Sequence, residues 1–308
     1  MEPGKGYLNI YNVLKVTYPA LTSITLRVSD MYTFNVPDKG VKVLFAMGVL
    51  CSIYLITRSV AYPLRRLLTW LRSVGNANLY LSRTSNVKHY AVIHGASNQC
   101  GKAFAKYLSE RGYALILVDR KREDLDAAEE FLKKEAKTAV QLHKVPFLQE
   151  HLVDQVKIQA IISEINQHGG LIKFFVNCKN LRMARNHLTP FHAIGLSQIV
   201  QINRENAEGY AALLSMFVRE MGKAPHPGVI NVRNTGEEEE HDLIASDLMF
   251  YSTNRFTTVF TEALEEAYKN LRTISVFTDF ELLSEEQNKN ALVRSSFNYL
   301  GVKKTLHV

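Results

Sequence analysis

Residues 89–102 read HYAVIHGASNQCGK, and the interpretation of the whole chain starts from this stretch. An apolar run ends at Gly95, and a second glycine, Gly101, precedes a segment with helical spacing. A glycine-rich turn between a strand and a helix lets backbone N–H groups approach a phosphate at the helix N-terminus. The stretch therefore predicts a strand, a phosphate-binding turn and a helix in direct succession.

Apolar runs recur along the rest of the chain, and they are continuous rather than alternating, which is typical of strands covered on both faces. The predicted strands are residues 89–94, 114–118, 139–145, 172–176, 228–232 and 272–277. The helical segments between them are residues 102–111, 123–137, 152–168, 207–221 and 253–269. This alternation predicts an α/β fold, a Rossmann-type doubly wound parallel sheet.

The positive charge of the chain is confined to its first third. The chain has 37 Lys and Arg against 30 Asp and Glu, a net charge of +7. Residues 1–90 hold 11 basic residues and three acidic ones, whereas residues 91–308 are nearly neutral at 26 against 27. The body of the protein lacks the basic excess that nucleic-acid binding needs, so we expect no nucleic-acid partner.

The most hydrophobic run in the chain lies in residues 41–60. Only Lys42 and Arg58, near its two ends, interrupt it. A membrane-spanning helix needs about twenty apolar residues, and basic side chains near its ends can reach the headgroups. The run therefore predicts a transmembrane helix, and a buried core helix is the alternative that fits the same pattern.

The residues after this run favour the membrane interpretation. Arg65, Arg66 and Arg72 follow it with Trp70 among them, which predicts a basic amphipathic linker on the headgroups. The positive-inside rule then places the chain after residue 60 on the cytosolic or matrix side. The predicted organisation is an N-terminal segment (1–40), a transmembrane helix (41–60), a basic juxtamembrane linker (61–88) and a Rossmann domain (89–308).

Residues 94–101 (HGASNQCG) resemble the Thr-Gly-x-x-x-Gly-x-Gly turn of the short-chain dehydrogenase/reductase family. Within this family the chain is most similar to the membrane-anchored branch of 17β-hydroxysteroid dehydrogenases and 3-ketoacyl-CoA reductases. The hydrophobic run and the basic linker contribute to this resemblance along with the turn. The resemblance implies four cofactor-binding positions. They are Gly95 and Gly101 in the turn, Arg120 beside the adenosine ribose, and Asn177 after the fourth strand. Arg120 would suit a 2′-phosphate, which the preceding Asp119 would repel.

Other positions depart from the family pattern. Gln99 replaces the middle glycine of the turn, where a side chain occupies space that the pyrophosphate needs, and His94 replaces the threonine. Residues 145–147 (VPF) stand where the family has an adenine-facing aspartate, and residues 278–279 (TD) stand in place of a Pro-Gly corner. The Asn-Asn-Ala-Gly loop reads NCKN from Asn177.

The catalytic pattern is retained only in part. The family's Tyr-x-x-x-Lys, in which the ammonium lowers the pKa of the phenol, appears as Tyr251 with Arg255. Arginine is not equivalent to lysine, because its planar fork is bulkier and directs its donors differently. Asn234 stands in the register of the serine that polarises the substrate, and the relay asparagine aligns with Asn206, with Asn203 as a second register. We interpret these positions as vestigial.

The cysteines and histidines indicate neither a disulfide framework nor a metal site. Cys51, Cys100 and Cys178 are far apart, and the two that fall in the cofactor region are expected to be inert buried thiols. The ten histidines show no metal-ligand spacing; His187 and His192 are five residues apart in a segment without helical or strand pattern. We expect no bound metal.

From these departures the sequence predicts a catalytically inactive short-chain dehydrogenase-like protein, not an enzyme, acting as a membrane-anchored accessory subunit of a larger assembly. Its expected partners are a membrane and other protein subunits. We expect no cofactor; if one binds, we expect it to be NADP. The alternatives are an NADPH-dependent reductase of 3-ketoacyl-CoA or ketosteroids, and a non-catalytic dinucleotide-binding subunit. The expected location is an organelle membrane, with the mitochondrial inner membrane slightly favoured over the endoplasmic reticulum.

Overall fold

The computed structural model divides into two compact units, Met1–Trp70 and Leu71–Val308. The second unit contains the sheet, and the first contains most of the apolar helical segment. The residues that the structure describes are 23–29, 32–82, 86–135, 141–147, 153–179, 197, 200, 204–234, 245–278, 283, 285–303 and 305–308.

The second unit is built on a seven-stranded sheet whose strands all run parallel. In sheet order the strands are β5 (Leu142–Pro146), β4 (Ala114–Asp119), β3 (His89–His94), β6 (Leu171–Asn177), β7 (Gly228–Asn234), β8 (Arg272–Thr278) and β9 (Thr305–His307). The chain order reverses at β3, because β4 and β5 lie on one side of it and β6 to β9 on the other. In open α/β sheets, ligands bind at the carboxyl ends of the strands at this reversal.

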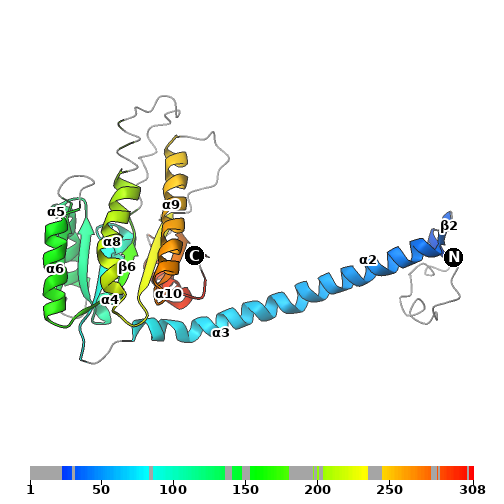
Figure 1. Ribbon diagram of the computed structural model, residues 1–308, viewed down its shortest axis with the longest axis horizontal. Helices are drawn as coiled ribbons and strands as arrows, with labels where there is room; N and C mark the ends of the chain where they lie inside the picture. Colours follow the sequence, from blue (N-terminus) through cyan, green and yellow to red (C-terminus); the bar gives the residue numbers. More distant parts are fainter. Residues whose placement is uncertain are drawn as a thin grey trace. The chain divides into compact units, whose positions relative to one another are not determined.

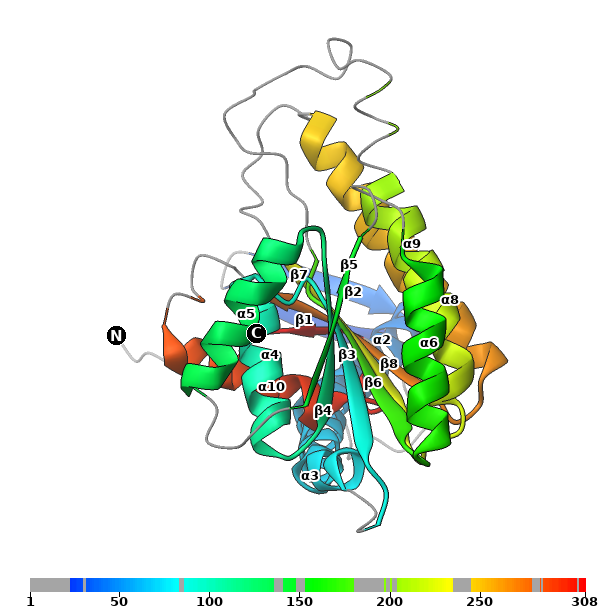
Figure 2. The same cartoon turned by 90° about the vertical axis from the view of Figure 1, so that its left-hand side faces the viewer.

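Helices cover both faces of the sheet (Figure 2). One face carries α4 (Gln99–Glu110), α5 (Arg122–Glu135) and α10 (Glu286–Tyr299), and the opposite face carries α6 (Gln155–Gln167), α8 (Gly209–Met221) and α9 (Ala245–Ala267). Each layer has its own buried hydrophobic cluster. The structure therefore confirms the predicted Rossmann-type doubly wound parallel sheet.

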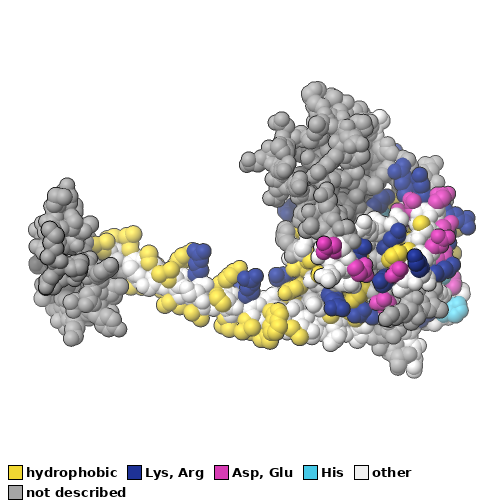
Figure 3. All heavy atoms as spheres, turned by 180° about the vertical axis from the view of Figure 1, so that it is seen from behind, with side chains coloured by type: hydrophobic (Ala, Val, Ile, Leu, Met, Phe, Trp, Pro, Cys, Tyr) yellow, Lys and Arg dark blue, Asp and Glu magenta, His cyan; other side chains and the backbone are white. Residues whose placement is uncertain are grey.

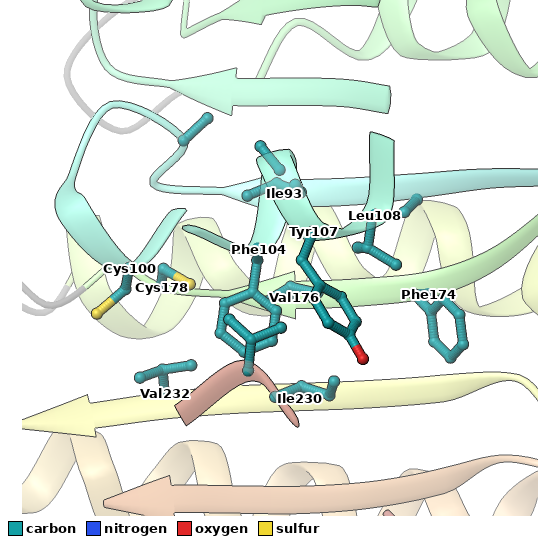
Figure 4. Close-up of a cluster of buried hydrophobic side chains, with 14 of the residues drawn as sticks. Ile93, Cys100, Phe104, Tyr107, Leu108, Phe174, Val176, Cys178, Ile230 and Val232 are labelled. Atoms are coloured by element: carbon teal, nitrogen blue, oxygen red, sulfur yellow. The ribbon is translucent and has the colours of Figure 1, made fainter. Parts of the chain in front are cut away.

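The core under α4 contains the rings of Phe104, Tyr107 and Phe174 among aliphatic side chains (Figure 4). The ring of Phe297 meets Phe174 edge-on at 5.1 Å between centroids and stacks on Tyr107 at 5.6 Å. Phe104 packs against the same ring at 6.2 Å. These contacts join α4, α10 and β6 and fix the helix that follows the glycine-rich turn against the sheet.

Some elements differ from the sequence predictions. The strand His89–His94 is found as predicted, whereas α10 and β9 were not predicted. In α10 only a few apolar residues, such as Leu292 and Phe297, face the core, and β9 is three residues long, so neither has a strong periodic signal. Helix α9 begins at Ala245 instead of residue 253, so Tyr251 lies within the helix.

The apolar segment of the first unit is helical and exposed. It begins with α2 (Asp38–Ile56), passes through a π-helical turn, η1 (Thr57–Ala61), and continues into α3 (Tyr62–Leu81) (Figure 1). Apolar side chains with interspersed basic ones line it (Figure 3). Within the described residues, Ala46–Leu81 is long and apolar enough to span a membrane, and its most apolar window is not buried in protein. A short hairpin, β1 (Ser23–Ser29) with β2 (Tyr32–Pro37), precedes it.

The last turns of α3 belong to the folded second unit. The side-chain Nδ2 of Asn76 donates hydrogen bonds to the carbonyl oxygens of Asn298 (3.0 Å) and Leu300 (2.5 Å). These carbonyls end α10 and have no partner further along that helix. Tyr80 is buried, and the Nζ of buried Lys173 on β6 donates to the carbonyl of Ser82 at 2.7 Å. The C-terminal turns of α3 are thus packed against the domain through Asn76 and Tyr80.

Candidate functional site

The glycine-rich turn has the tight geometry that its two glycines permit. Gly95 has a φ of +80°, a left-handed conformation that favours glycine. A Cβ on Gly95 would lie 2.7 Å from the backbone nitrogen of Lys179, and a Cβ on Gly101 would lie 2.1 Å from the carbonyl oxygen of Gly95. The turn between β3 and α4 is therefore closed by direct backbone packing, and it leaves the N-terminus of α4 at the carboxyl edge of the sheet.

Side chains within the turn hold its shape. Asn98 caps α4, since its Oδ1 accepts from the backbone N–H of Gly101 at 2.7 Å while its Nδ2 donates to the carbonyl of Cys178 at 2.7 Å. Asp119, at the end of β4, accepts from the backbone N–H and hydroxyl of Ser97 at 2.9 and 2.7 Å. The carboxylate of Asp119 thus braces the turn, a role that the sequence analysis did not assign to it.

Gln99 does not distort this turn. It is the first residue of α4, and among the described non-glycine residues only His226 has a positive φ. The side chain of Gln99 is exposed. The backbone at this position therefore does not require glycine, and the N-terminus of α4, which favours bound anions, forms with Gln99 in place.

The predicted cofactor positions come together at the ends of neighbouring strands. Gly95 follows β3, Asn177 ends the adjacent β6, and Arg120 follows β4 on the other side. The Oδ1 of Asn177 accepts from the backbone N–H of Lys179 at 3.2 Å, and Arg120 is half-buried. These three residues and the glycine-rich turn lie where the phosphates of a bound dinucleotide would be expected.

A cluster that is absent from the family pattern lies at the carboxyl ends of β3, β5 and β6. The buried ammonium of Lys179 lies 4.7 Å from the ring centroid of Phe147, and the His94 ring lies 5.8 Å from the same centroid. Burial and the neighbouring Lys179 charge hold the pKa of His94 well below its ordinary value, against a smaller opposing contribution from Asn177. The imidazole is therefore neutral at physiological pH.

Acid is expected to destabilise the domain through His94. Its pKa is low in the folded chain but about 6.5 in the unfolded chain. Below that pH the unfolded state binds a proton that the folded state does not, so the free energy of unfolding falls by up to about 1.4 kcal/mol per pH unit. Urea unfolding of the full chain in detergent at pH 7 and pH 5 measures this loss. His94→Gln should reduce it, and the exposed His168→Gln should not; equal losses in both variants would contradict the assignment.

The catalytic positions lie on elements that reach the same edge of the sheet. Tyr251 is in α9, Asn234 ends β7, and Asn206 lies in a π-helical turn, η3 (Arg204–Glu208). The side chains of these three residues, and residues 180, 187, 192 and 203, lie outside the described part of the structure. Arg255, four residues after Tyr251, is exposed.

The two cysteines near the turn are buried in the core (Figure 4). Burial raises the pKa of Cys100 to about 12 and that of Cys178 well above its ordinary value. Both thiols are therefore protonated at physiological pH, which argues against nucleophilic catalysis. Within the described residues, no group of three or more His, Cys, Asp or Glu side chains could hold a metal ion.

Sequence reasoning missed the residues that build the turn around its glycines. Asn98 stands directly before the first helical residue, and asparagine is a preferred N-cap, so this position had a readable signal. The bridge from Ser97 to Asp119 joins residues that are 22 positions apart, and only the pairing of β3 with β4 brings them together.

Comparison with known proteins establishes the class that this fold and turn define. Residues 89–278 match the family model described as short chain dehydrogenase, which covers more than half of the chain. The chain therefore belongs to the short-chain dehydrogenase family.

Named relatives and solved structures agree with this membership. The chain is 22% identical to very-long-chain 3-oxoacyl-CoA reductase-B of Danio rerio over 234 residues, 74% of this chain and 68% of the relative. It is 23% identical to human 17-beta-hydroxysteroid dehydrogenase type 3 over 225 residues, 69% of this chain and 68% of the relative. A metagenomic short-chain oxidoreductase in complex with NADP has the same fold, with a TM-score of 0.54 and 19% identity over 73% of this chain and 98% of that one.

These relatives correct the prediction that the chain is not an enzyme. They are named as reductases and dehydrogenases, which indicates an oxidoreductase despite the low identity. That prediction counted each changed motif position as a lost contact with the cofactor or the substrate. The structure shows at Gln99 that one such change leaves the turn intact.

Proposed function

We propose that this chain is a membrane-anchored, NADP(H)-dependent reductase of a ketone of the 3-oxoacyl-CoA or ketosteroid type. The observation that carries the proposal is the intact strand–turn–helix unit at Gly95–Gly101, with the N-terminus of α4 at the carboxyl edge of the sheet. It is supported by family membership and by the names of the relatives.

The phosphate side of the cofactor would be held by the turn. The backbone N–H groups at the start of α4 and the partial positive charge of the helix favour the pyrophosphate. The carboxylate of Asp119 accepts hydrogen bonds from Ser97 and from the backbone N–H of Arg120 (2.8 Å), and the guanidinium of Arg120 would bind a 2′-phosphate. NADP(H), when bound, supplies the hydride for carbonyl reduction.

In this proposal Tyr251 is the proton donor to the substrate oxygen. A phenol positioned beside a carbonyl acts as a general acid and contributes to the rate through proton transfer. Asn234 and Asn206 carry amides, which can donate hydrogen bonds to the same oxygen or to a bridging water in place of the family's serine and asparagine.

The cofactor assignment is tested by thermal unfolding of the full chain in detergent. NADPH at a hundred times its dissociation constant should add about 2.7 kcal/mol to the free energy of unfolding. Arg120→Ala should weaken NADPH binding and leave NADH binding nearly unchanged, because only NADPH carries the 2′-phosphate. Oxidation of NADPH is then followed with a 3-oxoacyl-CoA and with a 17-ketosteroid. Absence of both a thermal shift and turnover would overturn the proposal.

We further propose that the segment Ala46–Leu81 anchors the protein in an organelle membrane, with the domain on the cytosolic or matrix side. The apolar helix and the basic residues that follow it support this orientation. The expectation of a mitochondrial inner membrane rested partly on an accessory role, which an oxidoreductase does not require. Association with other protein subunits stays a prediction.

Membrane anchoring has a direct biochemical test. Alkaline carbonate should leave the protein in the membrane pellet, because extraction at high pH removes peripheral proteins and not spanning helices. Release into the supernatant would contradict the anchor. A fluorescent fusion compared with an endoplasmic reticulum marker tests the location.

A further inference from the structure

A buried arginine, Arg233, stands near the carboxyl end of β7, one residue before Asn234. Its side chain is only 2% exposed. Arg233 and Asn231 are two residues apart on one strand and so share a face of the sheet. That face is covered by α8 and α9, since Asn231 contacts Tyr210 of α8 and Thr261 of α9.

The polar neighbours of Arg233 satisfy one another. The Tyr210 hydroxyl donates to Oδ1 of Asn231 at 3.0 Å, and Nδ2 of Asn231 donates to the hydroxyl of Thr261 at 3.4 Å. The Thr261 hydroxyl in turn donates to the carbonyl of Thr257 at 2.7 Å. This chain of hydrogen bonds includes no acceptor for the guanidinium.

Two donors of Arg233 have no partner within the described part of the chain. Its Nε and Nη2 atoms are buried, and neither donates a hydrogen bond to any acceptor there. These two N–H groups lie on the same edge of the planar guanidinium and form the fork that binds two oxygens of one anion. Burial lowers the pKa of Arg233 to about 10, with Tyr210 opposing, so the group keeps its charge at neutral pH.

We propose that Arg233 is an anion-binding residue of the substrate site, and that its Nε/Nη2 fork takes a carboxylate carried by the substrate. Burying a charge without a counter-charge has a high free-energy cost. A ligand with a full negative charge is therefore expected to bind at Arg233 more tightly than a neutral carbonyl. A carboxylate is planar and presents two oxygens side by side, which matches the fork.

The position of Arg233 separates this anion from the phosphates of the cofactor. The turn that would hold the pyrophosphate follows β3, and β6 lies between β3 and β7. The inference goes beyond the proposed function, because 3-oxoacyl thioesters and ketosteroids carry no carboxylate, and the fork therefore adds keto acids as a further substrate class. Binding can be measured without NADPH and without turnover, so a failure of this inference and a failure of the reductase proposal give different results.

The test compares a keto acid with a neutral ketone on the full chain in detergent. The probes are 4-oxopentanoate, 2-pentanone and inorganic phosphate, and the readouts are thermal unfolding and calorimetric titration. The variants are Arg233→Met, which removes the charge and keeps similar length, Arg233→Lys, which keeps the charge without the fork, and Arg219→Met. Arg219 is an exposed arginine on α8 and serves as the matched control.

We expect 4-oxopentanoate to bind the wild-type and Arg219→Met proteins and 2-pentanone to bind neither measurably. Arg233→Met should raise the dissociation constant for 4-oxopentanoate roughly tenfold or more, with Arg233→Lys between the two. If Arg233→Met does not fold, the Arg233→Lys comparison decides. Equal affinities in wild type and the Arg233 variants would overturn the inference. Tighter binding of phosphate than of 4-oxopentanoate at Arg233 would overturn the assignment to a carboxylate.

Discussion

Replacing Gly101 with alanine should abolish dinucleotide binding and lower the free energy of unfolding by about 2 to 3 kcal/mol. A Cβ at this position would lie 2.1 Å from the carbonyl oxygen of Gly95 and 2.8 Å from the Cα of Ala96. Both obstacles are backbone atoms of the turn, which cannot rotate away as the end of a flexible side chain can. The turn must therefore open, and α4 loses its position at the phosphate site. NADPH titration and urea unfolding measure the two losses.

Gly75→Ala is the matched control for this prediction. Gly75 lies in α3, and an added Cβ there meets nothing within 4 Å. Alanine is preferred over glycine in a helix by about 1 kcal/mol, so this variant should be as stable as wild type or slightly more so, with unchanged NADPH affinity. A Gly101→Ala protein that still binds NADPH like wild type would show that the turn is not the cofactor site.

Tyr251→Phe should reduce kcat by about a hundredfold to ten-thousandfold while NADPH affinity stays within a factor of two or so of wild type. The variant removes one hydroxyl and retains the ring. If Tyr251 donates the proton to the substrate oxygen, only the chemical step loses its acid. Steady-state NADPH oxidation with the best ketone substrate, together with NADPH titration, separates the two quantities.

Tyr268→Phe provides the control on the same side of the sheet. Tyr268 is half-buried just beyond the end of α9, far along the helix from Tyr251. Its loss of a hydroxyl should leave kcat unchanged. A Tyr251→Phe enzyme with wild-type kcat would remove Tyr251 from the mechanism and leave the proton donor to be found elsewhere at the carboxyl edge.

The incorrect prediction of an inactive protein has a physical explanation. It treated each departure from the family motif as a lost contact, as if only one residue type could serve at each position. Gln99 begins a regular helix with its side chain exposed, and Asn98 caps that helix. Asp119, expected to repel a 2′-phosphate, has its carboxylate engaged with Ser97. Neither arrangement is visible in a position-by-position comparison.

The strands of the central sheet could be predicted because their signal is local. The run at β3 and its neighbours are continuous apolar segments, and burial on both faces of a parallel sheet requires that pattern. The two turn glycines were likewise readable, since one needs a left-handed φ and the other a close backbone approach. The exposed helix from α2 into α3 follows from its length and composition.

The sequence alone determined the strands from β3 to β8 with the helices between them, the glycine-rich turn and the apolar helix, because each depends on residues that are near one another in the chain. Only the tertiary structure decided which distant residues share a site. It places Asn76 at the end of α10, more than two hundred positions away, and it buries Arg233 beside Tyr210. In the sequence Arg233 is an ordinary basic residue at a strand end. Its unsatisfied donors arise only where β7, α8 and α9 pack together and exclude water.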